Sequence, residues 1–156
     1  MKRLLPFTLL ALMTPHAQPQ TIASLVDKSR ILLLFAPSDT SPLFQRQLTL
    51  LAHHGPDLAE RDLVLLPILG NAGPAASTNT LRDLHPPVVS PTLSIQEQLT
   101  LRHRFHIAPG DFTILLLGKD GGEKLRQQIP ITLEKLNATI DAMPMRRDEI
   151  RTRLKR

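Results

Sequence analysis

Hydroxyl and carboxylate side chains gather in residues 37–42 (PSDTSP), directly after an apolar run. A serine nucleophile needs a base such as histidine within hydrogen-bond reach and a third group that orients that base. No recognised motif places a histidine in this role for Ser38 or Ser41. The place of Ser41 before Pro42 is instead typical of a helix N-terminus. We expect no catalytic residue here. If the protein is instead a non-thiol enzyme, Asp39 is the acid–base candidate of this segment.

Two histidines could share a metal ion. His103 and His106 are three residues apart on a predicted helix and therefore lie on one face of it. Two ligands are too few for a zinc site, so His85 or Asp111 would have to join them. We expect solvent-exposed histidines and no metal site.

The chain contains no cysteine. Thiol–disulfide exchange requires a thiolate that attacks a disulfide sulfur, and a serine hydroxyl is far less acidic and forms no mixed disulfide. The sequence therefore excludes thiol redox chemistry. It also shows no cofactor-binding motif, so we expect no cofactor.

Residues 118–122 (GKDGG) are rich in glycine but lack the spacing of a phosphate-binding loop. A tight hairpin turn explains the glycines. Cations near this turn could form an anion-binding face if the terminal helix packs beside it, or they could pair with acids such as Asp141. The candidate partner or anion surface comprises Ser38, Asp39, Lys119, Asp120, Lys124, Arg146 and Arg147.

The composition indicates one globular domain with an aliphatic core. Of the 156 residues, 42% are hydrophobic but only 3% are aromatic, and Trp and Tyr are absent. Protein modules that stack nucleic-acid bases rely on aromatic side chains. The composition therefore argues against nucleic acid as a partner.

The formal net charge of +5 is concentrated near the C-terminus. Residues 146–156 hold six Lys or Arg against Asp148 and Glu149. Such a basic tail could contact an anionic surface or an envelope protein. The alternative is a solvated helical end.

Residues 1–17 have the three-part pattern of a secretory signal peptide. Lys2 and Arg3 precede an apolar run that is shorter than the about 20 residues of a membrane-spanning helix. Ala17 offers a small residue for cleavage, which would leave Gln18 as the first residue of an exported chain, periplasmic or secreted. An N-terminal membrane anchor is the alternative. No later segment is long and apolar enough to span a membrane.

Three continuous apolar runs predict strands that are covered on both faces, as in a parallel sheet centre. They are residues 31–36 (ILLLFA), 63–69 (LVLLPIL) and 112–117 (FTILLL). Pro67 places the second strand at a sheet edge or strand end. Residues 123–127 can return after the glycine turn as an antiparallel partner.

Apolar residues at helical spacing predict three helices, which span residues 43–54, 95–106 and 133–143. Gly55 ends the first helix, Ser94 and Glu97 form a capping box for the second, and Pro144 ends the third before the basic tail. Residues 71–92, with four prolines, are expected as a long irregular loop.

The element order β-α-β-α-β-β-α predicts an α/β fold, a three-layer α/β/α sandwich around a four-stranded mixed sheet. An α/β sandwich with another strand order is the alternative. We expect this domain to span residues 29–145, between an N-terminal extension (residues 18–28) and the basic tail (residues 146–156).

Several segments resemble known proteins. Residues 35–37 and 113–121 resemble the thioredoxin segments that lead into the active-site loop and follow the cis-proline. Residues 60–64 (ERDLV), 116–122 (LLGKDGG) and 140–147 (IDAMPMRR) resemble a bacterial thioredoxin-like domain-of-unknown-function family. That family is related to the repeated domain of sushi-repeat-containing secreted proteins and of a coiled-coil-domain-containing matrix protein. The resemblance covers about residues 29–149 and implies a thioredoxin-like fold, export and no established activity.

The departures from thioredoxin concern its redox site. Where thioredoxins place Cys-x-x-Cys, this chain reads residues 37–42 (PSDTSP). Near the cis-proline position it has Thr113, where a cis peptide bond is not expected. The resemblance therefore implies a scaffold that lacks both halves of the redox site.

Three functional hypotheses remain. The leading one is a non-redox, non-enzymatic interaction domain. The second is a small-ligand binder or non-thiol enzyme that uses the vestigial active-site crevice near Asp39, which would require a concave pocket there. The third is a passive envelope protein whose basic tail touches anionic lipid or polymer.

Overall fold

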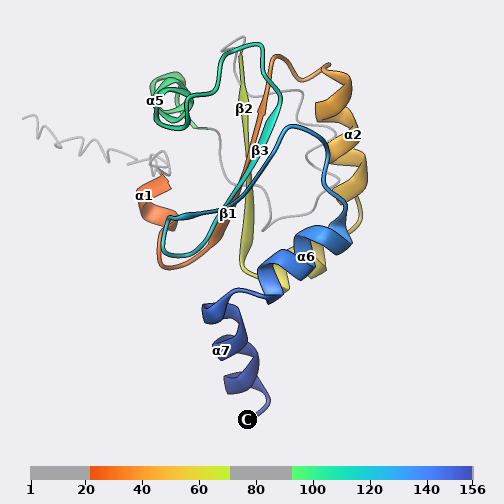
Figure 1. The fold of residues 1–156 in the computed structure, drawn as a ribbon, viewed down its shortest axis with the longest axis vertical. Coiled ribbons are helices and arrows are strands. Elements are labelled where there is room, and N and C mark those ends of the chain that lie inside the picture. The colour runs from red at the N-terminus through yellow and green to blue at the C-terminus, as the bar shows by residue number, and fades with distance from the viewer. Residues whose placement is uncertain (1–21, 71–92, 156) are drawn as a thin grey trace, which may run out of the picture.

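The computed structural model describes residues 22–70 and 93–155 of the chain, and Figure 1 shows them as a central sheet with helices on both faces. The expected signal peptide and the expected loop at residues 71–92 lie outside the described residues. The elements are α1 (Ile22–Leu25), β1 (Arg30–Ala36), α2 (Pro42–Leu51), α3 (Gly55–Glu60), β2 (Leu63–Leu69), α5 (Ile95–Phe105), β3 (Thr113–Leu117), β4 (Glu123–Gln127), α6 (Leu133–Asp141) and α7 (Pro144–Arg153).

The sheet has the strand order β2-β1-β3-β4. Strand β1 runs parallel to β2 and antiparallel to β3, and β4 is antiparallel to β3. The predicted four-stranded mixed sheet is confirmed, and β2, which contains Pro67, is an edge strand, where a missing ladder N–H is tolerated.

Strand β1 is buried along its whole length because helices cover both faces of the sheet. Successive side chains of a strand point to opposite faces. Leu32 and Leu34 join one apolar core with residues of α2 and α6, whereas Leu33 and Phe35 join a second core with residues of α5. Figure 1 shows α2 and α6 on one side of the sheet and α5 on the other, so the three-layer α/β/α sandwich is confirmed.

Two local predictions from the sequence hold in detail. In the capping box of α5, Ser94 Oγ accepts a hydrogen bond from the Glu97 backbone N–H (3.3 Å), and the Ser94 backbone N–H donates to Glu97 Oε2 (3.0 Å). The glycine turn joins β3 to β4, and Gly121 has a φ of 70°, a left-handed conformation that glycine adopts at no steric cost.

The predicted helix over residues 43–54 is wrong at its C-terminal end. Helix α2 ends at Leu51, and the chain turns through His53 with a φ of 65°. Gly55 and Pro56 then begin α3 instead of ending α2. Proline fits the first turn of a helix, where its missing N–H has no intrahelical partner. Ser41 precedes α2 as predicted, but its side chain makes no capping hydrogen bond.

The segment predicted as a basic tail is a helix over most of its length. Pro144 follows the end of α6, as predicted, but it also occupies the first turn of α7. Arg146, which belongs to the predicted tail, is only 2% exposed.

At the N-terminal end of the described chain, Leu25 lies in the expected N-terminal extension yet is buried in the core with α5.

The lengths of the helices bear on membrane insertion. Within residues 22–70 and 93–155, no helix combines the length and the apolar character that crossing a bilayer requires.

A buried glutamine ties α2 to the segment that precedes α6. Gln47 Nε2 donates to the Ile131 backbone oxygen (3.2 Å), and Gln47 Oε1 accepts from the Ile131 backbone N–H (2.7 Å). The side chain of Gln47 is fully buried and thus satisfies two backbone groups that have no access to water.

We predict that Gln47→Leu lowers the free energy of unfolding by about 1–3 kcal/mol, because it leaves both polar groups of Ile131 without a partner in the core. Urea denaturation measures this change. Gln96→Leu, the same substitution at an exposed position of α5, is the control and should have little effect. Equal losses in the two variants would contradict the assignment.

Candidate functional site

Residues 37–42 form the connection between β1 and α2, at the C-terminal end of β1. The hydroxyl oxygens of Ser38 and Thr40 lie 3.0 Å apart and share a hydrogen bond. The Asp39 backbone oxygen accepts a hydrogen bond from Gln45 Nε2. Ser38 thus pairs with a second hydroxyl, whereas an activated serine nucleophile would pair with a base.

A buried arginine lies at the same end of the sheet, where β1 and β2 end. Arg102 of α5 is 5% exposed and donates to the backbone oxygens of Ala36 and Ile68 (2.9 Å each) and Ala108 (2.8 Å). Burial lowers its pKa, and the charge of Asp111 offsets part of this effect. The guanidinium group therefore holds together the ends of β1 and β2 and the loop that precedes β3.

The residues of the surface predicted from the sequence lie in two groups, at opposite ends of the strands of the sheet. Strand β3 is antiparallel to β1, so Lys119, which follows β3, lies where β1 begins. Ser38 and Asp39 follow the other end of β1. The structure therefore does not bring these two residues together with Lys119, Asp120 and Arg146.

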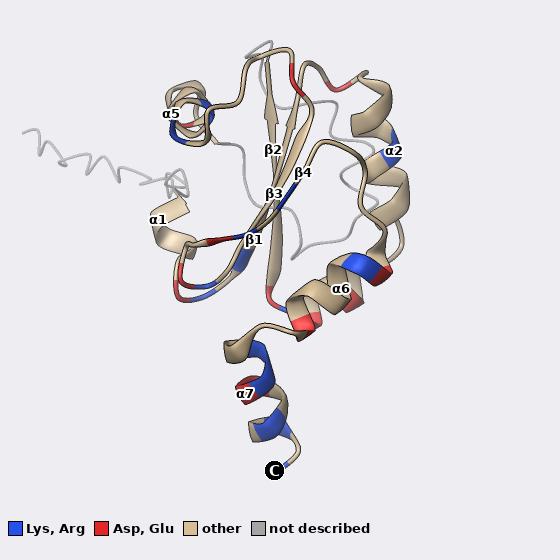
Figure 2. Ribbon diagram, in the orientation of Figure 1, with Lys and Arg blue, Asp and Glu red and all other residues tan. Residues whose placement is uncertain are grey.

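Charged residues are concentrated where β1 begins and where α6 and α7 meet, as Figure 2 shows. We call this set of ion pairs the edge network. Its five cations and four carboxylates are Arg30, Arg61, Lys119, Arg146, Arg153, Glu60, Asp62, Asp141 and Glu149.

Arg146 anchors α7 in this network. Its Nη2 lies 2.5 Å from Glu60 Oε1, its Nε lies 3.2 Å from Asp141 Oδ1, and its Nη1 donates to the Glu60 backbone oxygen at 3.2 Å. Arg153, two turns further along α7, reaches the same carboxylate of Glu60 at 2.9 Å. Helix α7 is therefore bound to the C-terminal ends of α3 and α6 through charged side chains.

Glu149 connects α7 to the sheet. Its Oε1 lies 3.1 Å from Arg30 Nη2, at the start of β1, and 2.8 Å from Lys119 Nζ, after β3. Lys119 Nζ also lies 2.8 Å from Asp62 Oδ2. Arg30 is only 1% exposed and also donates to the Arg61 backbone oxygen at 2.8 Å. One carboxylate of α7 thus faces cations from two strand ends.

A bidentate pair completes the network. Arg61 Nη2 and Nε lie 2.6 and 3.1 Å from the two carboxylate oxygens of Asp141. Two N–H groups of one guanidinium thus bind the two oxygens of one carboxylate, an arrangement that is stronger and more directional than a single ion pair. It fixes the end of α3 against the end of α6, which are the two elements that Arg146 contacts.

Two carboxylates of the network, Asp141 and Glu149, are held in their charged form. Burial alone would raise the pKa of Glu149, but hydrogen bonds from Lys119 and Arg30 outweigh it, so the pKa of Glu149 lies below its usual range. Burial likewise opposes the ionisation of Asp141, and hydrogen bonds from Arg61 and Arg146 lower its pKa overall. Both groups stay ionised at neutral pH.

The predicted candidate cations differ in their surroundings. Lys119 and Arg146 belong to the edge network, and Lys124 Nζ lies 2.6 Å from Asp120 Oδ2 within the hairpin. These three cations pair with carboxylates of the protein itself. From the sequence, such pairing was the alternative to an anion-binding face. Arg147 is exposed on α7 and makes no ion pair within the described residues.

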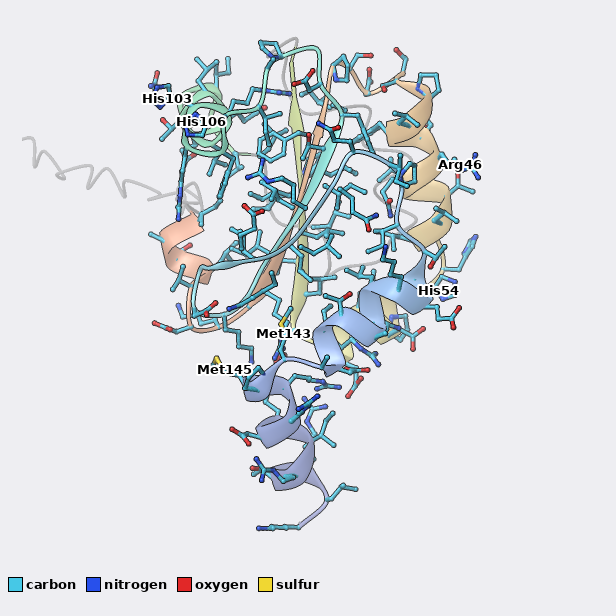
Figure 3. The ribbon with its side chains drawn as sticks, viewed as in Figure 1. Arg46, His54, His103, His106, Met143 and Met145 are labelled. Atoms are coloured by element: carbon cyan, nitrogen blue, oxygen red, sulfur yellow. The ribbon has the colours of Figure 1, made fainter. Side chains whose placement is uncertain are left out.

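The histidines do not gather into a metal site in the described part of the chain. His103 lies on α5, but His106 follows the end of the helix with a left-handed φ of 56°, so the two do not share a helix face as predicted. Both lie across the sheet from His54 (Figure 3), and their ring centroids are 6.5 Å apart. Among residues 22–70 and 93–155, no group of three or more His, Asp and Glu side chains could hold a metal ion.

A shallow hollow of about 500 Å³ runs along one face of α7. It is lined by Met145, Asp148, Glu149, Thr152 and Arg153. Met145 is 47% exposed, and Figure 3 shows it near the start of α7, where the helix leaves the domain. This face offers a partner both apolar and charged contacts.

Sequence reasoning missed Arg30 and Arg102 as parts of the structure. Arg30 directly precedes the continuous apolar run of β1, and a charge at the start of a buried central strand needs a partner. That signal could have identified Arg30. Arg102 looks like an ordinary polar residue of an amphipathic helix, and only the position of three backbone oxygens reveals its role.

Residues 21–149 match the family described as domain of unknown function (DUF4174). The chain belongs to this family. The three motifs on which the resemblance rests, residues 60–64, 116–122 and 140–147, all contribute side chains to the edge network. The residues on which that resemblance rests are therefore ones that join α3, the β3–β4 turn, α6 and α7.

Solved structures confirm the thioredoxin-like fold. Peroxidoxin BcpB from Mycobacterium tuberculosis is 15% identical, with 78% of this chain and 84% of that chain covered and a TM-score of 0.56. Thioredoxin peroxidase I from Plasmodium yoelii is 16% identical, with 81% and 79% covered and a TM-score of 0.56. A secreted disulfide oxidoreductase from Mycobacterium tuberculosis is 13% identical, with 78% and 86% covered and a TM-score of 0.51.

The fold is shared with these redox proteins, but the thiol chemistry is not. The chain has no cysteine, so residues 37–42 cannot carry out thiol–disulfide exchange. The peptide bonds of the described residues, including the one before Thr113, are trans. This DUF4174 domain therefore keeps the scaffold without thiol redox activity.

We predict that Arg146→Met lowers the free energy of unfolding by about 2–4 kcal/mol, because it removes the buried cation that contacts Glu60 and Asp141 together and ties α7 to α3 and α6. Arg147→Met, the same substitution at the next residue, should change it by less than about 0.5 kcal/mol, since Arg147 is exposed. Urea denaturation of both variants checks this. Equal effects would show that Arg146 does not anchor α7.

We also predict that acid releases α7 before it unfolds the sheet. The pKa values of Asp141 and Glu149 are lower in the folded protein than in the unfolded chain. Their stabilisation is therefore present above the unfolded-state pKa, about 4, and is lost as the pH falls through the lower folded-state values.

Amide hydrogen exchange between about pH 6 and pH 2 measures this release. Protection of the α7 amides should fall first, while the amides of α5, which has no residue in the edge network, serve as the control. Simultaneous loss of protection in α5 and α7 would contradict the prediction.

Proposed function

We propose that this DUF4174 chain is an exported, non-redox binding domain without enzymatic activity, and that its partner binds at α7. The observation that carries the proposal is the position of its charged residues. They form ion pairs with one another and hold a helix at the end of the sandwich, instead of lining an open reactive site.

The ionisation of the carboxylates supports a role in binding rather than catalysis. A general acid or base that works near neutral pH needs a carboxyl pKa that is raised towards the working pH. The pKa values of Asp141 and Glu149 are shifted in the opposite direction. These groups are suited to constant charge, which stabilises structure and attracts a charged partner.

The accessible face of α7 supports its assignment as the binding surface. Arg146 is the buried residue of this helix, and most of its other side chains reach solvent. Helix α7 extends away from the sandwich in Figure 1, so the rest of the domain does not cover its outer side. Arg147 and Arg151 are both exposed on this helix and can contact a charged partner.

Export is the part of the proposal that rests on the sequence. Residues 1–17 have the pattern of a signal peptide, and cleavage after Ala17 would leave a chain that contains every described element. We also propose kinship with the repeated domain of sushi-repeat-containing secreted proteins and of a coiled-coil-domain-containing matrix protein, which agrees with a role outside the cytoplasm.

The test combines localisation with capture. We expect the tagged chain to be recovered outside the cytoplasm with Gln18 as its first residue, and to retain an envelope component in cross-linking experiments. An Asp39→Asn variant should retain the same component, whereas a variant with Arg147→Gln and Arg151→Gln should lose it.

Other outcomes would overturn the proposal. An uncleaved chain in the cytoplasm would contradict export. Loss of the component in Asp39→Asn but not in the α7 variant would favour the alternative, a ligand-binding or non-thiol enzymatic site near Asp39.

A further inference from the structure

The outer face of α7 carries a stripe of cations. Arg147 and Arg151 are four residues apart on α7, which places them on one side of the helix, and Lys155 follows in the turn after its C-terminal end. Leu154 lies beside them, with helical backbone angles and 82% of its surface exposed. We call these four residues the α7 stripe.

The edge network fixes the direction in which the stripe points. Arg146 and Arg153 lie about 100° or more around the helix from Arg147 and Arg151, and both bind Glu60 of the domain. Because this side is held against the sandwich, the opposite side of α7 faces solvent. The stripe is thus oriented outwards by the ion pairs that anchor the helix.

The stripe has more positive charge than its neighbours neutralise. Arg151 pairs with Asp148, and both side chains are largely exposed. Arg147 and Lys155 make no ion pair within the described residues, and both are exposed. Exposed ion pairs are weak and exchange readily with other partners. The surface is therefore complementary to an extended negative charge.

We propose that the α7 stripe docks the domain on a membrane surface that contains anionic phospholipid, which names the partner for the binding domain proposed above and rests on that proposal. Long cationic side chains around one exposed leucine can bind headgroups and insert a single apolar group without a shaped pocket. Each Lys or Arg near an anionic bilayer strengthens binding about fivefold.

The experiment measures sedimentation of residues 18–156, which contain every described element, with vesicles. The vesicles are made of phosphatidylcholine with or without phosphatidylglycerol. The wild-type chain should bind only vesicles with phosphatidylglycerol and should dissociate in about 1 M salt, where the Debye length is about 3 Å.

Two triple variants separate the stripe from net charge. Arg147→Gln, Arg151→Gln and Lys155→Gln together should weaken binding about 100-fold. The matched control, Lys28→Gln, Arg46→Gln and Lys135→Gln, removes the same charge from exposed positions outside α7 and should weaken it far less. Leu154→Asn should weaken binding without changing its dependence on salt.

Equal weakening by the two triple variants would overturn the proposal, because net charge alone would then explain binding. Binding of the wild-type chain to pure phosphatidylcholine, or to neither kind of vesicle, would also overturn it. If vesicles fail but the stripe variant alone loses a captured acidic protein, the stripe belongs to a protein interface. In that case the proposed binding function stands and the lipid assignment falls.

Discussion

The burial of one arginine, Arg146, determines how the C-terminal helix is placed. A guanidinium group that is removed from water is costly unless carboxylates compensate it. Here Glu60 and Asp141 supply that compensation from α3 and α6, while Glu149 binds cations at the start of β1 and after β3. Since Arg146 is the buried residue of α7, the helix is held by charge pairing and not by an apolar core of its own.

The two ends of the strands of the sheet therefore have different roles. At the C-terminal end of β1, Arg102 holds the strand ends together, and residues 37–42 have no thiol and a Ser38 that pairs with the hydroxyl of Thr40 and not with a base. The opposite ends of the strands lie near the three motifs of the sequence resemblance, residues 60–64, 116–122 and 140–147, whose charged side chains form the edge network. A thioredoxin-like scaffold has thus been retained while its distinctive side chains lie away from residues 37–42.

The strands, the order of elements along the chain and the capping box of α5 could be predicted because their signals are local: continuous apolar runs, a glycine turn, and Ser94 three residues before Glu97. The boundary between α2 and α3 was missed because Gly55 and Pro56 can either end a helix or begin one. The edge network could be predicted only in part. Lys119 and Arg146 were identified as candidates, but their partners are far away in the sequence, and spacing along a chain does not reveal which distant charges meet.

The central claim is that ion pairs between α7 and the ends of the strands hold this helix in place. A double-mutant cycle between Lys119→Met and Glu149→Gln, with the stability of α7 measured by amide hydrogen exchange, tests it most directly. We predict a coupling free energy of about 1–3 kcal/mol, because the two side chains meet where both are largely shielded from water. Additive effects, with a coupling near zero, would contradict it and would show that α7 keeps its position without the network.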